Sequence, residues 1–311
     1  MTLDPACMAY PMRRRGMDHD LYAWSNIHTR PALAWPGGCR IAVAIMISLE
    51  WFPILPAADA AFKAPGHMQT AYPDFRHYTS REYGTRIGLY RMLDACAQVG
   101  ARVSVATNAA IAQRYPSIIT DIVSAGHEIV AHSTEMDGTI DSSLPEAREC
   151  ALITQSLDIL EVATGQRPRG WMSIARSQSF NTPRLLKQAG LAYMCDWPND
   201  DLPYRFETPA GPITNVPLNH ELSDRQIITV QQHSADSYVQ QIQDAHAWLA
   251  SEAAPRMLPL HVTPYILGLP YRIGAFERLL RWLAQSEATD FLTTGEIASA
   301  LSPSLVPEHR P

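Results

Sequence analysis

The 311-residue sequence lacks the features that would place it with nucleic acid-binding or membrane-spanning proteins. Its charges are scattered and sum to −6, and beyond Arg13 to Arg15 no three residues of one sign follow each other. Nucleic-acid binding usually needs a basic patch or stripe, so we expect no nucleic-acid partner. No run of roughly 18 apolar residues is present, as a membrane helix would require, so we expect no membrane partner either.

Cysteines are few and are poorly placed for cross-links. The five of them are odd in number, widely spread and never arranged as C-x-x-C. This pattern argues against a disulfide framework and against a structural zinc site made of cysteines. The N-terminus also lacks the apolar core of a signal peptide. We therefore expect a reducing, cytoplasmic location.

The hydrophobic pattern predicts one α/β domain. Residues 41–47 form a continuous apolar run, which is typical of a strand buried on both faces. Further strands are expected near residues 102–107, 128–131, 191–195, 227–230, 257–261 and 289–292. Amphipathic helices are expected over 82–98, from a capping box at 143–146 to Leu160, and from Ser234 to Leu249. Alternating strands and helices predict a parallel sheet with helices outside it.

The chain contains no linker-like stretch or internal repeat that would divide it. We therefore expect an N-terminal arm over residues 1–38, a single catalytic barrel over 39–303 and a short tail over 304–311. The arm is rich in Pro, Gly and Arg without sustained periodicity, so it either wraps the domain, reaches a neighbouring subunit or is a disordered tail.

Polar residues follow several of the predicted strands. Reactive groups of α/β barrels lie just after the carboxyl ends of strands, where the loops converge on one open mouth. The residues that meet this rule are Glu50, Asn108, His132, Asp196 and His261.

Two motifs resemble the polysaccharide deacetylases, also called carbohydrate esterase family 4. The segment GHEIVAHSTEMD at 126–137 resembles the family's G-H-E-x-x-x-H-[ST] motif, and LPLHVTPYILGLPYR at 258–272 is similar to its late Leu-His motif. Four segments resemble the allantoinase-like branch of that superfamily. They are RPALAWPGGCRIAVAIMISLEWFP at 30–53, REYGTRIG at 81–88, RPRGWMSIARSQSFNTPRLL at 167–186 and CDWPNDDLPY at 195–204.

The resemblance covers roughly residues 20–300. It implies a distorted (β/α) barrel with about seven parallel strands, hydrolysis of a non-peptide amide bond, and a homo-oligomer. It also shows where the sequence departs from the family. The family's Asp-Asp pair after the first strand is Glu50-Trp51 here, and its second motif histidine is Met136.

These departures leave His132 as the one family metal ligand that remains. A catalytic zinc ion needs about three protein ligands, so we predict no cofactor and no metal. The allantoinase-like branch works without metal, which agrees with this prediction. The alternative is zinc or another divalent metal, held by His132 together with Asp137.

Three residues are predicted to be catalytic. Glu50 is placed to activate water as a general base, unless it is a structural carboxylate paired with an arginine such as Arg86. His132 is expected to position water or the substrate carbonyl and to line the pocket for the oxyanion, unless it is a core histidine. His261 stands where the family's proton donor lies, so the resemblance implies that it protonates the leaving nitrogen. The alternative for His261 is a packing role.

Six residues are predicted to bind a small polar substrate. Guanidinium groups bind carboxylate or ureide oxygens in pairs, an asparagine matches an amide, acidic loop residues accept ring N–H groups, and a tryptophan can wall a flat pocket. Surface ion pairs, turns and core packing are the alternatives. The residues are Asn108, Trp171, Arg176, Asp196, Asp200 and Arg272.

The leading hypothesis is therefore an allantoinase-like hydrolase that opens a small cyclic amide, ureide or imide. A metal-dependent deacetylase of an N-acetylated sugar or small compound is the second hypothesis. The third is an inactive barrel that serves as a binding module.

Overall fold

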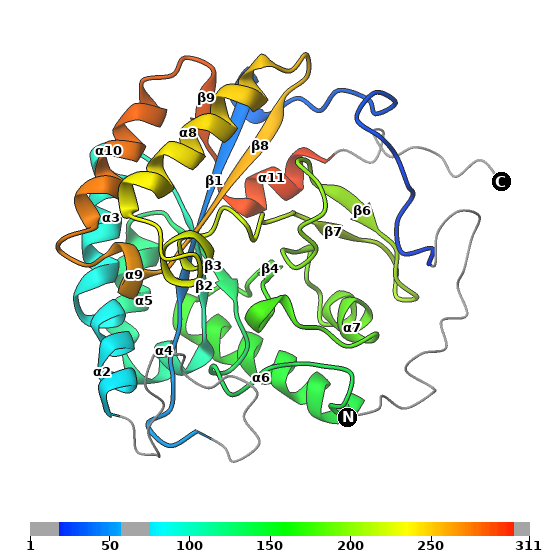
Figure 1. Cartoon of the computed structure of the whole chain (residues 1–311). Coiled ribbons are helices and arrows are strands. Elements are labelled where there is room, and N and C mark those ends of the chain that lie inside the picture. Colours follow the sequence, from blue (N-terminus) through cyan, green and yellow to red (C-terminus); the bar gives the residue numbers. More distant parts are fainter. Residues whose placement is uncertain (1–18, 57–74, 302–311) are drawn as a thin grey trace.

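The computed structural model describes residues 19–56 and 75–301, and it has one curled, mostly parallel sheet with helices around it (Figure 1). The strands run in the order β6-β7-β5-β4-β3-β2-β1-β8, and β9 also pairs with β1. Only the pair of β6 and β7 is antiparallel among the described strands. Their bounds are β1 Ile41–Leu49, β2 Ser104–Thr107, β3 Glu128–Ala131, β4 Gly170–Trp171, β5 Tyr193–Met194, β6 Tyr204–Phe206, β7 Ile213–Asn215, β8 Arg256–Val262 and β9 Thr289–Phe291. The predicted α/β class and barrel-like sheet are confirmed.

Helices cover the outer face of the sheet (Figure 1). The α-helices are α2 Phe75–Tyr83, α3 Leu89–Gln98, α4 Ala109–Arg114, α5 Pro116–Ser124, α6 Glu146–Thr164, α7 Thr182–Gln188, α8 Ala235–Ser251, α9 Pro264–Leu267, α10 Ile273–Ala284 and α11 Thr294–Ala300. Short 3₁₀ turns span η1 Pro36–Gly38 and η3 Ile174–Arg176, and π turns span η2 Gly84–Gly88 and η4 Arg225–Val230. No described helix is long and apolar enough to cross a membrane.

Strand β1 is buried on both faces, as its apolar run predicted. Ile45 and Ile47 point to the large cluster under the outer helices, whereas Ala44 and Met46 point to a smaller cluster inside the curled sheet. Side chains alternate across a strand, so one continuous apolar run serves both layers. Each fully buried isoleucine contributes about 1.5–3 kcal/mol to folding. This packing fixes the carboxyl end of β1, where Glu50 follows.

One predicted strand is wrong. Residues 227–230 lie in the π turn Arg225–Val230, and Ile227 and Ile228 are its buried residues. A short apolar run of this kind is compatible with a buried strand and with a buried helical turn, so periodicity alone does not separate the two. The π turn begins at Arg225, two residues before the predicted strand.

The helix predicted over 82–98 is broken by the π turn at Gly84–Gly88. A β-carbon at Gly88 would lie 2.1 Å from the backbone oxygen of Pro264, so only glycine permits this approach to α9. The π turn changes which residues face inward, because it adds a residue to the helical repeat. Met92 is fully buried, whereas Ile87 and Tyr90 are 41% and 36% exposed.

The two predicted helix starts have different outcomes. The side chain of Ser234 caps α8 by accepting a bond from the backbone N–H of Ser237, as expected. The predicted capping box before α6 is wrong, because Pro145 occupies its N-cap and Ser143 bonds to Asp141 instead.

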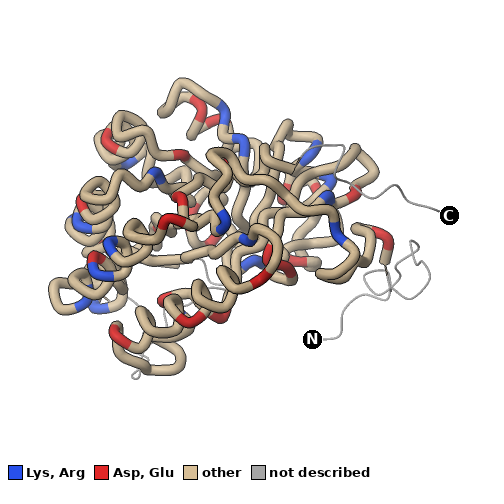
Figure 2. The backbone as a smooth tube through the Cα atoms, turned by 90° about the horizontal axis from the view of Figure 1, so that it is seen from above, with Lys and Arg blue, Asp and Glu red and all other residues tan. Residues whose placement is uncertain are grey.

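Residues 19–38, the described part of the predicted arm, lie against the edge of the sheet. The backbone oxygen of Leu21 accepts a bond from the N–H of Glu207, just beyond β6, and the ring of Tyr22 packs 6.0 Å from that of Phe206. This contact covers an otherwise open edge strand. Residues 1–18 of the arm and 304–311 of the tail lie outside the described residues. Lysine and arginine are interspersed with acidic residues along the described chain (Figure 2).

Candidate active site

Glu50 lies directly after β1, and two side chains hold its carboxylate. Nη2 of Arg225 donates to both of its oxygens, at 2.7 and 3.0 Å, and the Tyr265 hydroxyl donates to Oε2 at 2.6 Å. The same Arg225 nitrogen also donates to the Tyr265 oxygen at 2.6 Å. Arg86, which we named as a partner only for the alternative structural role of Glu50, lies 3.8 Å from Glu82 on the surface. Glu50 is therefore buried in an ion pair with a guanidinium.

Neither partner of Glu50 was predicted from the sequence. Arg225 begins the π turn and precedes the predicted strand at 227–230 by two residues, and Tyr265 lies within the late motif without being singled out. One general signal was present, because a buried carboxylate requires a cation or several donors. That rule predicts that a partner exists, but it does not say which of the arginines supplies it.

His132 follows β3 and is buried. Its Nδ1 lies 2.6 Å from the backbone oxygen of Met172. A carbonyl oxygen only accepts, so Nδ1 carries the proton, and burial lowers the pKa of the ring and favours its neutral form. Nε2 of His132 is consequently a hydrogen-bond acceptor. This tautomer can hold a water molecule, but it cannot donate to an oxyanion as we predicted.

His261 lies on β8 and faces the same space. Its Nε2 lies 2.6 Å from the Ser48 hydroxyl, and its Nδ1 lies 3.2 Å from Nη2 of Arg176. A guanidinium only donates, so Nδ1 accepts and Nε2 carries the proton. Burial, followed by the positive charges of Arg176 and Arg225, lowers the pKa of His261 well below its ordinary value. His261 is thus neutral near pH 7 and is not the resting proton donor that the resemblance implied.

Asn108 and Asp196 form hydrogen bonds that hold the strand ends and loops of the site in place. The Asn108 side chain accepts from the backbone N–H of Trp51 at 2.8 Å and donates to the backbone oxygen of His132, so it ties the ends of β1 and β3 together. Asp196 accepts from the backbone N–H and the hydroxyl of Ser173, at 2.7 and 2.9 Å, and from Gln178 at 2.6 Å. Both side chains are buried with their polar atoms in use, so they position loops rather than contact a substrate.

Asp196 predicts a specific pH dependence of stability. Burial raises its pKa from 3.8 to about 6, so between these values the folded protein retains a proton that the unfolded chain has released. Asp196 therefore contributes fully to the free energy of unfolding below pH 4. This contribution, about 3 kcal/mol, is lost as the pH rises through 6. We expect Asp196→Asn to remove this part of the decline in the free energy of unfolding, measured by urea titration between pH 4 and pH 7.

The matched control for this measurement is Asp158→Asn, because the Asp158 side chain is 59% exposed on α6. It should show the same decline as the parent protein. Equal declines in the parent and in Asp196→Asn would mean that Asp196 does not hold the proton.

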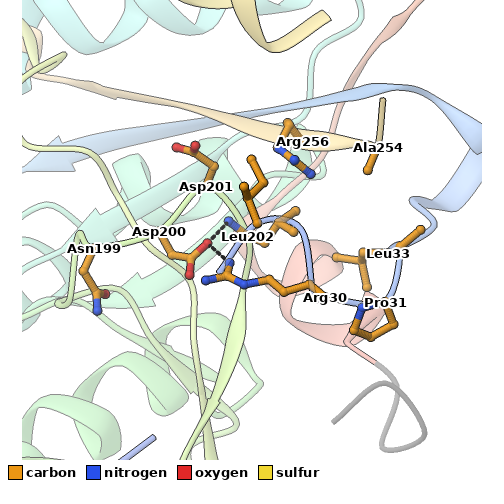
Figure 3. A pocket seen from close by; sticks show the side chains of 11 residues that line it. Arg30, Pro31, Leu33, Asn199, Asp200, Asp201, Leu202, Ala254 and Arg256 are labelled. Carbon is orange, nitrogen blue, oxygen red and sulfur yellow. Dashed lines mark hydrogen bonds and ion pairs between the residues drawn. The ribbon is translucent and has the colours of Figure 1, made fainter. Parts of the chain in front are cut away.

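Asp200 does not belong to the site. It pairs with Arg30 of the N-terminal arm at 2.5 Å and lines a pocket with Arg256, the first residue of β8 (Figure 3). The loop after β5 runs back toward the amino end of the sheet, where the Met257 N–H donates to the Asp201 oxygen. This end is opposite to the one at which Glu50 lies. The prediction of a substrate contact at Asp200 is therefore wrong.

Trp171 and Arg272 also lack the contacts that we predicted. Trp171 is fully buried in the core under the helices, and its indole N–H donates to Ser173 at 2.9 Å, so neither ring face is open to a substrate. Arg272 precedes α10, stacks 5.0 Å from the ring of Tyr271 and donates weakly to the Ile266 oxygen at 3.5 Å. Among the described residues, neither is placed with Glu50.

The residues present do not fit a catalytic zinc ion. Met136, at the second histidine position of the motif, is buried against Phe52 and Ile174. Residues 19–56 and 75–301 contain no group of three His, Cys, Asp or Glu side chains placed to share a metal, so Asp137 does not complete a site with His132. The cation that contacts Glu50 is the Arg225 guanidinium.

Three comparisons agree with this fold. The polysaccharide deacetylase family model matches residues 84–194. A protein of Schizosaccharomyces pombe, assigned by name to the polysaccharide deacetylases, is 24% identical over 310 residues, covering 90% of this chain and 95% of its own length. A Pseudomonas aeruginosa PAO1 structure with the same assignment is 28% identical, has a TM-score of 0.77 and is matched over 87% of this chain and 93% of its own.

The structure of Puue allantoinase is also 28% identical, with a TM-score of 0.78 over 94% of this chain and 97% of that one. The similarity therefore extends over nearly all of both chains, well beyond the segment that the family model matches. Residues 84–194 thus match the polysaccharide deacetylase family, and the fold is shared with a polysaccharide deacetylase-type structure and with an allantoinase.

Proposed function

We propose that this protein hydrolyses amide-type C–N bonds outside peptides, and that its substrate is a small cyclic amide, ureide or imide such as allantoin. The observation that carries the proposal is the buried Glu50 carboxylate, held by Arg225 and Tyr265 within electrostatic range of His132. The 28% identical allantoinase structure supports the choice of a cyclic amide.

Glu50 and His132 are both acceptors, which is what a hydrolytic water needs. The Glu50 carboxylate has about four acceptor positions, and the bonds from Arg225 and Tyr265 use three of them. One position is left for water, and the unprotonated Nε2 of His132 offers a second acceptor. In this proposal the two side chains hold one water molecule and orient its lone pair toward the substrate carbonyl.

Glu50 then carries the proton of that water to the leaving nitrogen. Glu50 takes it as the water oxygen bonds to the carbonyl carbon, and the carbonyl π electrons move to the oxygen. The Arg225 guanidinium lies beside this developing negative charge. When the C–N bond breaks, the nitrogen takes the proton from Glu50. In this mechanism Glu50, and not His261, is the acid. His261 instead forms hydrogen bonds that hold Arg176 and Ser48.

Deacetylation of an N-acetylated sugar or small compound is the second candidate, because residues 84–194 match the deacetylase family. An inactive binding module, a cytoplasmic location and a homo-oligomer also stay predictions. The first of these is an outcome of the test below.

The test is a product assay with allantoin, hydantoin, succinimide and N-acetylglucosamine. We expect ring opening of at least one cyclic compound, detected as a new carboxylate by nuclear magnetic resonance. Release of acetate from N-acetylglucosamine alone would establish the deacetylase instead. No turnover of any of the four, by protein that still binds one of them, would favour the binding module.

A further inference from the structure

Arg176 is a half-buried guanidinium whose donors are mostly unused. A guanidinium has five N–H donors. Nη1 donates to Nδ1 of His220 at 3.3 Å and Nη2 donates to Nδ1 of His261 at 3.2 Å. Nε is buried and has no hydrogen-bond partner in the described part of the chain. Buried polar groups are normally satisfied, so the buried Nε indicates a partner that the described chain does not supply.

The positive charge of Arg176 also has no carboxylate in contact with it among the described residues. Glu50 is already paired with Arg225. Asp196 is near enough to act on the pKa of Arg176, but its oxygens accept from Ser173 and Gln178. No described carboxylate forms an ion pair with Arg176, whose acceptors are two imidazole nitrogens. A desolvated charge without a counter-charge is unfavourable, and an anion bound there would relieve it.

The backbone at this position is held in an unfavourable conformation. Ala175 and Arg176 have φ angles of 53° and 55°, in the left-handed region that residues other than glycine rarely adopt. Two such residues in succession point the Arg176 side chain toward His261 and therefore toward the mouth of the barrel. Strain of this kind persists where the surrounding structure enforces it, and it is concentrated at binding and catalytic sites.

We propose that Arg176 binds a carboxylate of the substrate, so that an amide or ureide that carries a carboxylate binds more tightly than its neutral counterpart. This inference rests on the proposed function for the reacting bond, but the binding of the anion does not depend on turnover. A planar guanidinium matches the two oxygens of a carboxylate in a paired arrangement. The carboxylate docks on Arg176 while the amide carbonyl lies between Glu50 and His132.

Direct binding to the parent protein tests the inference, with two probes that differ in charge. Succinamate carries one amide and one carboxylate, and succinamide is its neutral counterpart of nearly the same shape. We expect calorimetry at pH 7.5 to show that succinamate binds at least about tenfold tighter. Such a ratio corresponds to the loss of one charge-assisted contact, about 1.4 kcal/mol.

Two variants assign this preference to Arg176. Arg176→Gln should bring the two dissociation constants within about twofold of each other, whereas Arg176→Lys should keep an intermediate preference because it retains the charge without the planar fork. Arg281→Gln is the matched control, because the Arg281 side chain is 51% exposed on α10. It should leave the parent preference unchanged.

The inference is overturned if the parent protein binds both probes equally, or if Arg176→Gln and Arg176→Lys both keep the full preference. Its failure is distinguishable from failure of the proposed function. Hydrolysis of neutral hydantoin without any preference for succinamate would remove the inference and leave the function. If the protein prefers succinamate in a way that depends on Arg176 but hydrolyses no amide, the inference stands and the proposed function fails.

Discussion

Replacing Glu50 by Gln should lower kcat for the preferred amide by about 10²–10⁴-fold, which is the usual contribution of a general base. The amide of Gln has nearly the same shape, but it cannot accept the proton of water. The change also leaves Arg225 without its counter-charge, so stability must be measured beside activity. The measurement is steady-state kinetics together with thermal unfolding of the same preparations.

Glu50→Asp separates the two effects. It keeps a carboxylate that can pair with Arg225, but it withdraws the oxygens from the water position, so kcat should fall while most of the stability remains. Glu161→Gln is the matched control, because the Glu161 side chain is 46% exposed on α6 and should be silent in both measurements. If Glu50→Gln is folded and keeps more than about one tenth of the parent kcat, Glu50 is not the base.

Replacing Arg225 by Met should lower the free energy of unfolding by about 3 kcal/mol, because the Glu50 carboxylate would remain buried without its cation. We expect the lower end of the usual range for a broken buried pair, since 25% of the Arg225 side chain is exposed while only 5% of Glu50 is. Tyr265 would also lose the donor to its oxygen. Urea unfolding at pH 7.5 measures the change.

The control for this prediction is Arg278→Met on the surface of α10. Arg278 is 57% exposed and pairs with Asp236, which is 79% exposed, so its loss should cost less than about 1 kcal/mol. Similar costs for the two substitutions would show that the pair of Arg225 and Glu50 is as weak as a surface pair. The double variant with Glu50→Gln should recover part of the stability lost in Arg225→Met, since the buried charge is then gone.

The sequence predicted the parts of the fold that depend on long apolar runs. β1 is nine residues long and buried throughout, and the polar residues that follow β1 and β3 do meet at one edge of the sheet. β4 contains two residues, and β6 and β7 contain three each, and strands of that length have no periodicity to read. Their place in the sheet comes from tertiary pairing with neighbouring strands.

The site could be predicted only in part, for a different reason. Position after a strand places Glu50 and His132 at the same end of the sheet, because the chain has not yet turned away from that end. Asp200 lies six residues beyond β5, which is far enough for the loop to return to the other end of the sheet. Arg225 reaches Glu50 across 175 positions of sequence, and no local pattern encodes such a contact.

The central claim is that Glu50, held by a guanidinium, supports hydrolysis without a metal ion. The most direct test is to purify the protein without metal-affinity reagents, measure zinc, nickel, cobalt and manganese per chain by mass spectrometry, and assay its best amide substrate before and after chelation. We predict far less than one metal per chain and a rate that chelation leaves unchanged. About one metal per chain, with activity lost to the chelator and restored by zinc, would contradict the claim.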